Sequence, residues 1–256
     1  MASRLRVLSL FSGIGGFELG FEATGRFTTV AQSEIDPYAC QVLEKHWDVP
    51  NLGSVTDIKE GDLDGIGPVD VVLGGFPCQD ISCAGRGDGI EGGRSGLFFD
   101  LMRVVRMVRP RYVVLENVPM LLTGDSGRWM SAVLGELAES GYDAKWDCVP
   151  AAAVGAPHRR DRVFIVAYAN RERLEEWSQQ DGSPKAGKQA SRRNNARGRG
   201  QDAERRGGWW QTEPDVCRVV DGVPFRVDRL RALGNAVVPQ VAAIVAGWVL
   251  AIEDGA

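Results

Sequence analysis

Short apolar runs rich in β-branched residues alternate with helix-length segments through the first two thirds of this 256-residue chain. The composition of these runs is that of buried strands, and they fall at 7–11, 28–34, 69–75, 111–117 and 162–168. The segments 16–23, 37–47, 97–108 and 128–140 between them, and a closing segment at 236–252, are expected to be helices. This alternation predicts an α/β fold with a doubly wound, mostly parallel sheet, whose ligands bind at the carboxyl ends of the strands.

Residues 171–208 interrupt this pattern, because they are polar, rich in Gly, Arg and Gln, and nearly devoid of aliphatic side chains. Within them, residues 185–206 hold eight basic and two acidic side chains, a net charge of +6, whereas the whole chain carries −4. Such asymmetry indicates either an element that faces an anion or a solvated loop. We therefore expect one domain built from residues 1–170 and 226–256, with a short inserted region at 171–225.

The five cysteines, at positions 40, 78, 83, 148 and 217, are scattered without CxxC spacing. This pattern disfavours a disulfide framework and a structural zinc site, and no metal is expected. The chain opens without a signal-peptide pattern, and no uninterrupted apolar run reaches the ~18 residues of a membrane span. A protein of the reducing cytoplasm, away from membranes, is expected.

A glycine-rich turn, Phe11-Ser-Gly-Ile-Gly-Gly-Phe17, follows the first expected strand. Such a turn brings backbone N–H groups close to a ligand. Glu18 stands where a dinucleotide fingerprint has its third glycine, and a carboxylate there suits a pyrophosphate poorly. Glu34 ends the second strand and can accept bonds from ribose hydroxyls, or it caps the next helix; Asp57, after a presumed third strand, can accept an adenine amino group. Together they predict an adenosine cofactor without phosphates.

Cys78 directly follows the run 69–75, counted as the fourth strand, in a turn constrained by Gly75 and Pro77. A packed structural cysteine would more often lie inside an apolar run, so this position favours a nucleophile. The next residues, 84–96, contain six glycines and read either as a lid that closes over a substrate or as a simple surface loop. Arg86 and Arg94 within them are candidates for phosphate contacts.

Glu116 ends the strand 111–117 and is expected at the same rim of the sheet as Cys78. A nearby thiolate would raise the pKa of this carboxyl, which could then protonate a heterocycle nitrogen. Alternation along the last strand places Arg160 and Arg162 on one side. The chain has only two histidines, His46 and His158, which makes a histidine-based mechanism hard to build.

Five motifs occur in the order known from one enzyme family, and they are FSGIGGF (11–17), GGFPCQ (74–79), ENV (116–118), HRRDR (158–162) and LGNAVVP (233–239). In this order they resemble the motifs of the DNA cytosine-5 methyltransferases, and SGLFFDL (95–101) also fits a family cofactor element. The family's Gln-x-Arg-x-Arg motif has His158 here in place of glutamine, with both arginines retained. The region before Gly234 is short for a target-recognition domain.

The resemblance implies a Rossmann-like methyltransferase sheet, with 171–225 as a short target-recognition region. Cys78 would add to carbon 6 of a flipped-out cytosine, Glu116 would act on N3, and Arg160, supported by Arg162, would hold the O2 side. The donor would be S-adenosylmethionine, released as S-adenosylhomocysteine, bound by Phe11, Gly13, Gly15, Gly16, Glu34, Ile35, Asp57, Ile58, Pro77, Leu97 and Asn235. Contacts with DNA would come from Gln79, Arg86, Arg94, Arg192, Arg193, Arg197 and Arg199.

The expected partner is double-stranded DNA, with a cognate restriction endonuclease in the same cell as a further possibility. We expect a monomer of a prokaryotic cytoplasm, or a phage-encoded protein, associated with the nucleoid. Three alternatives stay open on the residues: a nucleotide-dependent dehydrogenase, an RNA cytosine methyltransferase on the same scaffold, and a catalytically silent DNA-binding relative.

Overall fold

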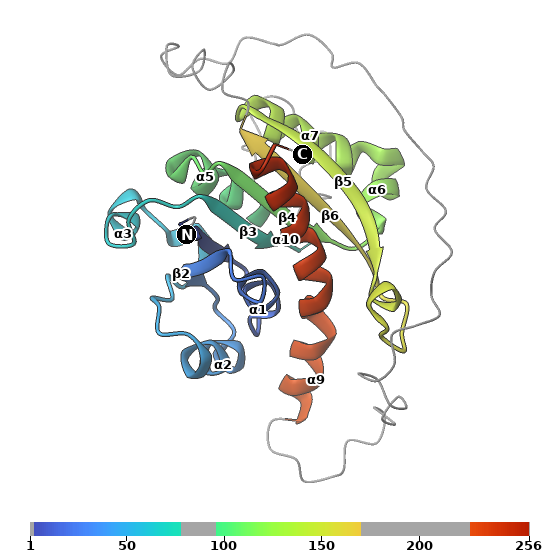
Figure 1. Cartoon of the computed structure of the whole chain (residues 1–256), viewed down its shortest axis with the longest axis horizontal. Coiled ribbons are helices and arrows are strands. Elements are labelled where there is room, and N and C mark those ends of the chain that lie inside the picture. Colours follow the sequence, from blue (N-terminus) through green and yellow to red (C-terminus); the bar gives the residue numbers. More distant parts are fainter. Residues whose placement is uncertain (1–2, 78–95, 170–225, 256) are drawn as a thin grey trace.

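The computed structural model describes residues 3–77, 96–169 and 226–255, which contain a six-stranded sheet (Figure 1). The order of the strands across the sheet is β2-β1-β3-β4-β6-β5. The strands are β1 (Leu5–Leu10), β2 (Phe27–Ser33), β3 (Val71–Gly75), β4 (Tyr112–Asn117), β5 (Tyr142–Pro150) and β6 (Asp161–Ala169).

The first four strands pair in parallel, whereas β6 is antiparallel to both β4 and β5. The carboxyl ends of β1, β2, β3 and β4 therefore lie at one edge of the sheet, and the amino end of β6 lies there too. The register places Gly75 of β3 beside Glu116 of β4, and Asn117 beside Val163 of β6. A mostly parallel α/β sheet is confirmed.

Two strand predictions need correction. No strand lies between β2 and β3 in the described residues, where a single bridge joins Gln32 to Asn51, so the strand that precedes Cys78 is the third and not the fourth. The sequence pattern also missed β5. This strand pairs only with β6 among the described strands, and its middle residues are exposed, so it lacks the continuous apolar run of a buried strand.

Helices follow most strands, as the alternation predicted, and they are α1 (Gly16–Glu22), α2 (Pro37–His46), α3 (Glu60–Asp64), α5 (Leu97–Val108), α6 (Met120–Thr123), α7 (Arg128–Glu139), α9 (Arg226–Asn235) and α10 (Pro239–Glu253). Short 3₁₀ turns occur at η1 (Val55–Asp57), η2 (Gly124–Gly127) and η3 (Ala151–Val154). The closing helix begins at Pro239 and not at 236, because proline is suited to the first turn of a helix. The short helix α9, just before it, was not predicted.

Two hydrophobic clusters cover the two faces of the sheet. Along β4, Val113 and Leu115 belong to the cluster formed with α5 and α7, while Tyr112 and Val114 belong to the cluster formed with α1 and α10. This alternation is the two-residue period of a strand buried on both faces. Figure 1 shows α10 crossing the face of the sheet that it shares with α1. The doubly wound arrangement is confirmed.

Two glycines of α1 allow the C-terminal segment to approach closely. A Cβ atom on Gly16 would overlap the backbone carbonyl of Val237, and one on Gly20 would overlap the carbonyl of Pro239. Any side chain at these positions would push the start of α10 away from α1. The pair of glycines thus brings residues from the far end of the chain beside the glycine-rich turn.

One stretch of the described residues, Arg231–Glu253, is long and apolar enough to cross a membrane by length and composition alone, with a mean hydropathy of 1.8. In α10, however, Val241, Val245 and Val249 are fully or almost fully buried against the sheet. One face of α10 thus packs on the sheet, whereas 28% of the apolar window as a whole is buried inside the fold.

The inserted region predicted at 171–225 lies outside the described residues. The division into a catalytic domain and a target-recognition region stays a prediction.

Candidate active site

A pocket of about 390 Å³ opens at the edge of the sheet where the carboxyl ends of β1 to β4 gather. Its wall also includes residues of the C-terminal segment between α9 and α10. Eight of the residues predicted from the sequence line it, and they are Phe11, Gly13, Gly16, Glu34, Pro77, Glu116, Arg162 and Asn235. Residues assigned to the cofactor and residues assigned to the base thus share one cavity.

The glycine-rich turn forms one wall of the pocket. Phe11 and Gly13 have left-handed backbones, with φ of 56° and 57°. The space where a Cβ of Gly13 would lie is empty, with no heavy atom within 4 Å. A ligand can therefore approach the backbone here, which is the usual reason for a glycine at such a turn.

The Glu34 carboxylate binds this turn from the end of β2. Its Oε2 accepts a hydrogen bond from the Gly13 N–H at 2.7 Å, and its Oε1 accepts from the N–H groups of Ile35 and Asp36 at 2.8 Å each. The cap of α2 itself is Asp36, which accepts two backbone N–H bonds. Glu34 therefore stabilises the backbone of both loops while it lines the pocket, and the ribose contact stays a prediction.

The Glu116 carboxyl lies on the opposite part of the wall, at the end of β4. The residue is only 9% exposed, and burial raises the pKa of its carboxyl above the ordinary value, against the lowering effect of Arg162 and Arg160. Its Oε1 lies 2.9 Å from Nε of Arg162. The expected direction of the pKa shift is confirmed, but its leading cause among the described residues is burial and not a neighbouring thiolate.

A hydrogen bond from a side chain of β4 holds the residue that follows β3 near Glu116. Asn117 donates a hydrogen bond through Nδ2 to the Phe76 carbonyl at 2.9 Å. A Cβ on Gly75 would lie 3.2 Å from Oε2 of Glu116, so only glycine leaves this carboxyl undisturbed. Pro77, the last residue before Cys78, lines the pocket.

Several predicted residues lie outside the described part of the chain. They are the nucleophile Cys78 and the DNA-contact candidates Gln79, Arg86, Arg94, Arg192, Arg193, Arg197 and Arg199.

The two arginines of the HRRDR motif both act electrostatically on Glu116, but their guanidinium groups bind different partners. Arg162 pairs with Glu116 in the pocket, whereas Arg160 donates through Nη2 to the carbonyls of Gly234 and Ala236, at 2.7 Å each. Arg160 precedes β6 and has a left-handed backbone, with φ of 39°, so the shared side inferred from strand alternation stays a prediction. A direct contact of Arg160 with the base stays a prediction without support from this geometry.

Four other cofactor candidates lie away from the described pocket wall. Gly15 faces the ring of Trp47, with which any Cβ would overlap. Ile58 is buried in the hydrophobic core, Ile35 is 71% exposed, and Leu97 begins α5. Their contacts with a cofactor stay predictions.

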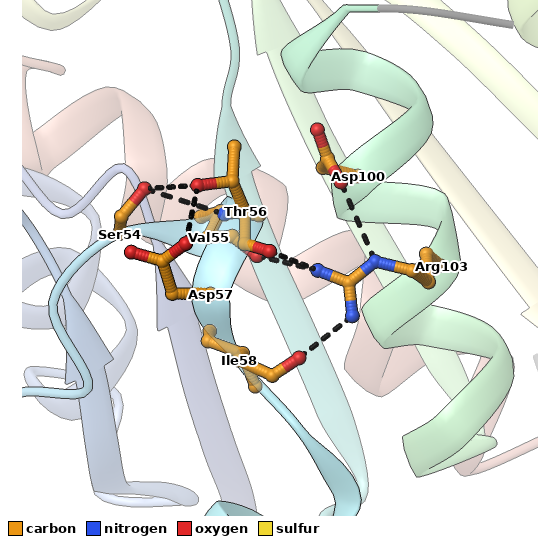
Figure 2. A network of polar contacts seen from close by, with 7 residues as sticks. All are labelled: Ser54, Val55, Thr56, Asp57, Ile58, Asp100 and Arg103. Carbon is orange, nitrogen blue, oxygen red and sulfur yellow. Dashed lines mark hydrogen bonds and ion pairs between the residues drawn. The ribbon is translucent and has the colours of Figure 1, made fainter. Parts of the chain in front are cut away.

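Asp57, the candidate for the adenine amino group, lies in the turn η1, which is held against α5 (Figure 2). The guanidinium of Arg103 donates to the carbonyls of Val55, Thr56 and Ile58 at 2.8, 3.1 and 2.7 Å. The side chain of Asp57 is exposed and accepts a bond from the Thr56 hydroxyl at 3.1 Å. Asp57 does not line the described pocket, so its adenine contact also stays a prediction.

Glu18 does not face a ligand, contrary to the reasoning from the sequence. It is completely buried in α1, receives a hydrogen bond from Nε2 of Gln32 at 3.3 Å, and has a pKa raised by burial. Its carboxyl cannot repel a pyrophosphate from this position. The dinucleotide alternative therefore has to be judged on other evidence.

The sequence reasoning missed one ion pair at the pocket. Arg231 of α9 pairs with Asp36, and both residues line the cavity. The basic residue three positions before Gly234 was the available signal, but nothing in its spacing indicated a partner nearly two hundred residues earlier.

An α/β sheet with a pocket at the carboxyl ends of its strands, walled by a glycine turn and a buried acid, has the architecture of an enzyme that binds a nucleoside cofactor. The model of the family described as "C-5 cytosine-specific DNA methylase" matches residues 5–205. The chain belongs to this family.

Relatives and solved structures agree with this assignment. Over 165 residues the chain is 39% identical to the Type II methyltransferase M.NgoBI of Neisseria gonorrhoeae, covering 64% of this chain and 51% of the relative. It is 41% identical over 167 residues to M2.BsuMI of Bacillus subtilis, covering 64% and 42%. A candidate DNA modification methyltransferase encoded within an E. coli prophage superposes with a TM-score of 0.53 at 26% identity, covering 67% of this chain and 48% of that one. The chain thus spans about half the length of the curated relatives that it matches.

Proposed function

We propose that this chain transfers a methyl group from S-adenosylmethionine to carbon 5 of a flipped-out cytosine in double-stranded DNA. The observation that carries the proposal is a single pocket with two kinds of wall. One wall holds the glycine turn and Glu34, and the other holds the buried pair Glu116–Arg162 beside Pro77, which directly precedes Cys78 in the chain.

The residues of the first wall fit an adenosine-type cofactor. The open space beside Gly13 admits a ligand close to the backbone, and the Glu34 carboxylate is a suitable acceptor for hydroxyl groups. Phe11, directly after β1, and Asn235, at the end of α9, complete this wall. When bound, S-adenosylmethionine supplies an electrophilic methyl group.

The residues of the second wall fit chemistry on a pyrimidine. Carbon 5 of cytosine is a poor nucleophile until a thiolate adds to carbon 6 and breaks the aromaticity. In the proposal, the Cys78 sulfur forms this bond while the electron pair of the 5,6 double bond moves to carbon 5. Glu116, whose pKa is raised by burial, donates a proton or hydrogen bond to N3, and Arg162 holds the carboxyl in place. After methylation, loss of the carbon 5 proton and return of the N3 proton to Glu116 restore the double bond and expel the Cys78 sulfur as a thiolate.

A stacked base hides carbon 6, so the cytosine must leave the duplex before it can react. Unstacking costs a few kcal/mol. Contacts with phosphates from the basic residues at 185–206, and from Arg86 and Arg94, are the proposed compensation. We also propose that the enzyme works in a prokaryotic cytoplasm, since its curated relatives are bacterial and are named Type II methyltransferases. That naming is the basis for proposing a cognate restriction endonuclease as a partner in the cell. A monomeric state stays a prediction.

The test is transfer of tritiated methyl groups from S-adenosylmethionine to plasmid DNA and to bulk RNA, followed by bisulfite sequencing of the DNA. The proposal predicts label in DNA at carbon 5 of cytosine, within one recurring sequence, and none with the C78S and C78A variants. Label in RNA alone would support the RNA methyltransferase. No label in either polymer, together with retained DNA binding, would support the silent relative.

A further inference from the structure

Arg160 lies outside the pocket wall and yet contacts the turn that completes it, residues 234–236, at which the helix α9 ends. Its Nη2 donates to the carbonyl of Gly234 and to that of Ala236, each at 2.7 Å. Asn235 lies between these two residues and lines the pocket. Hydrogen bonds from one charged group to both neighbours of Asn235 fix the backbone on either side of it.

The backbone of Arg160 supports a fixed and specific placement of this side chain. Its φ of 39° lies in the left-handed region, which residues other than glycine seldom adopt. Such a conformation persists only where the surrounding structure determines it. Here it lies immediately before β6, which begins at Asp161.

Three arginines near each other in the chain have three different environments. Arg159 is 84% exposed in its side chain and pairs with Asp161, Arg160 binds the turn at Gly234 and Ala236, and Arg162 binds Glu116. Each of the three arginine side chains carries the same positive charge. A difference between the effects of their variants therefore reports on the position of the side chain and not on its charge alone.

We infer that Arg160 is a positioning residue that ties the start of β6 to the Gly234–Ala236 turn, and that it thereby sets the affinity for the cofactor. Arg162, by contrast, serves the base side through Glu116. The inference rests on the proposed function for the identity of the cofactor, but the tie itself can be measured without it. It replaces the contact between Arg160 and the cytosine that the family motif suggested.

The experiment compares R160Q, R160G and R160K with the matched control R159Q in the full chain. Hydrogen–deuterium exchange at residues 233–238 is measured without ligand, and S-adenosylhomocysteine affinity is measured by calorimetry. R160Q is expected to speed hydrogen–deuterium exchange at residues 233–238 and to weaken the binding of S-adenosylhomocysteine about tenfold. A loss of this size is typical when the hydrogen bonds donated by one charged group are removed. The exposed control R159Q is expected to stay within about twofold of wild type in both measurements.

Two variants separate the guanidinium from general effects on folding. R160G relieves the left-handed backbone and removes the side chain, so it is expected to match R160Q in both measurements. R160K retains a cationic donor on a shorter side chain and is expected to fall between R160Q and wild type.

Unchanged exchange at 233–238 in both R160Q and R160G overturns the inference, as does equal loosening by R159Q. If the wild type binds no S-adenosylhomocysteine, the proposed cofactor is wrong, and the exchange measurement alone still decides the role of Arg160.

Discussion

Replacement of Glu116 by glutamine separates the chemical role of this residue from its structural role. E116Q keeps the size of the side chain and a carbonyl that can accept from Arg162, but it removes the ionisable proton and the charge. Removing one partner of a fully buried ion pair costs about 3–5 kcal/mol. The pair with Arg162 retains some exposure, 20% for the arginine and 11% for the acid, and glutamine preserves one hydrogen bond. We therefore expect a loss of about 1–2 kcal/mol in the free energy of unfolding.

The loss of activity should be much larger than this stability change implies. General acid catalysis contributes about 10²–10⁴ in rate, so kcat/KM for DNA methylation should fall by about that factor in E116Q. The protein would remain folded at assay temperature, because a loss of about 1–2 kcal/mol leaves most domains stable. Stability is measured by urea unfolding, and activity by tritiated methyl transfer.

Glu136 offers a matched control in the same fold. It is 4% exposed and pairs with Arg106, between α7 and α5, so E136Q removes a similar buried charge outside the pocket wall. E136Q should lose a similar amount of stability and keep its methylation activity. The reasoning is refuted if E116Q methylates DNA within about threefold of wild type, or if both variants lose activity in parallel.

The remaining predictions concern the packing of a glycine, the hydrogen bonds of Arg103 and the pH dependence of stability. G16A should lower the free energy of unfolding in urea by about 1–3 kcal/mol, because its Cβ would overlap the Val237 carbonyl. G135A, in α7 with open space around it, should raise that free energy by about 0.5–1 kcal/mol. Equal effects of the two substitutions would contradict this packing. R103M should lose about 2 kcal/mol because three backbone carbonyls lose their charged donor, and a loss below about 0.5 would show that the η1 turn does not need it. Burial raises the pKa of Glu116 above its ordinary value of 4.5, so the folded chain holds this proton more tightly than the unfolded chain. The stabilisation from protonated Glu116 is therefore complete below pH 4.5 and is lost as the pH rises through the folded pKa. Between these two pH values, the free energy of unfolding of E116Q should rise relative to that of wild type. Parallel plots of unfolding free energy against pH for the two proteins would exclude the pKa shift.

The sequence predicted the buried part of the fold well, for a physical reason. Strands such as β3 and β4 are covered on both faces, so their apolar runs are continuous and easy to recognise. The strand β5 escaped prediction because its exposed middle residues have no such pattern.

The sequence predicted which residues form the candidate site, but only partly which groups their side chains contact. Glu34 and Glu116 end buried strands, and strand ends place a side chain at the pocket edge. The Arg160 side chain, which binds Gly234 and Ala236, starts from a left-handed backbone at Arg160 itself. Ile58 is buried next to the η1 turn, and Arg103 donates to its carbonyl. Spacing along the chain carries neither kind of information, and the contact between Arg231 and Asp36 joins residues too distant in the chain for any local pattern.

The central claim is covalent catalysis at Cys78 beside Glu116, and a trapped reaction tests it most directly. A long duplex in which 5-fluorocytosine replaces cytosine is incubated with the protein and S-adenosylmethionine. Fluorine cannot leave carbon 5 as a proton does, so the sulfur bond to carbon 6 should persist after methylation. The account predicts that mass spectrometry finds the methylated base attached to the peptide that contains Cys78, and that the C78S variant gives no such adduct. An adduct at Cys40 or Cys148, or no adduct at all from a preparation that methylates ordinary cytosine, would contradict it.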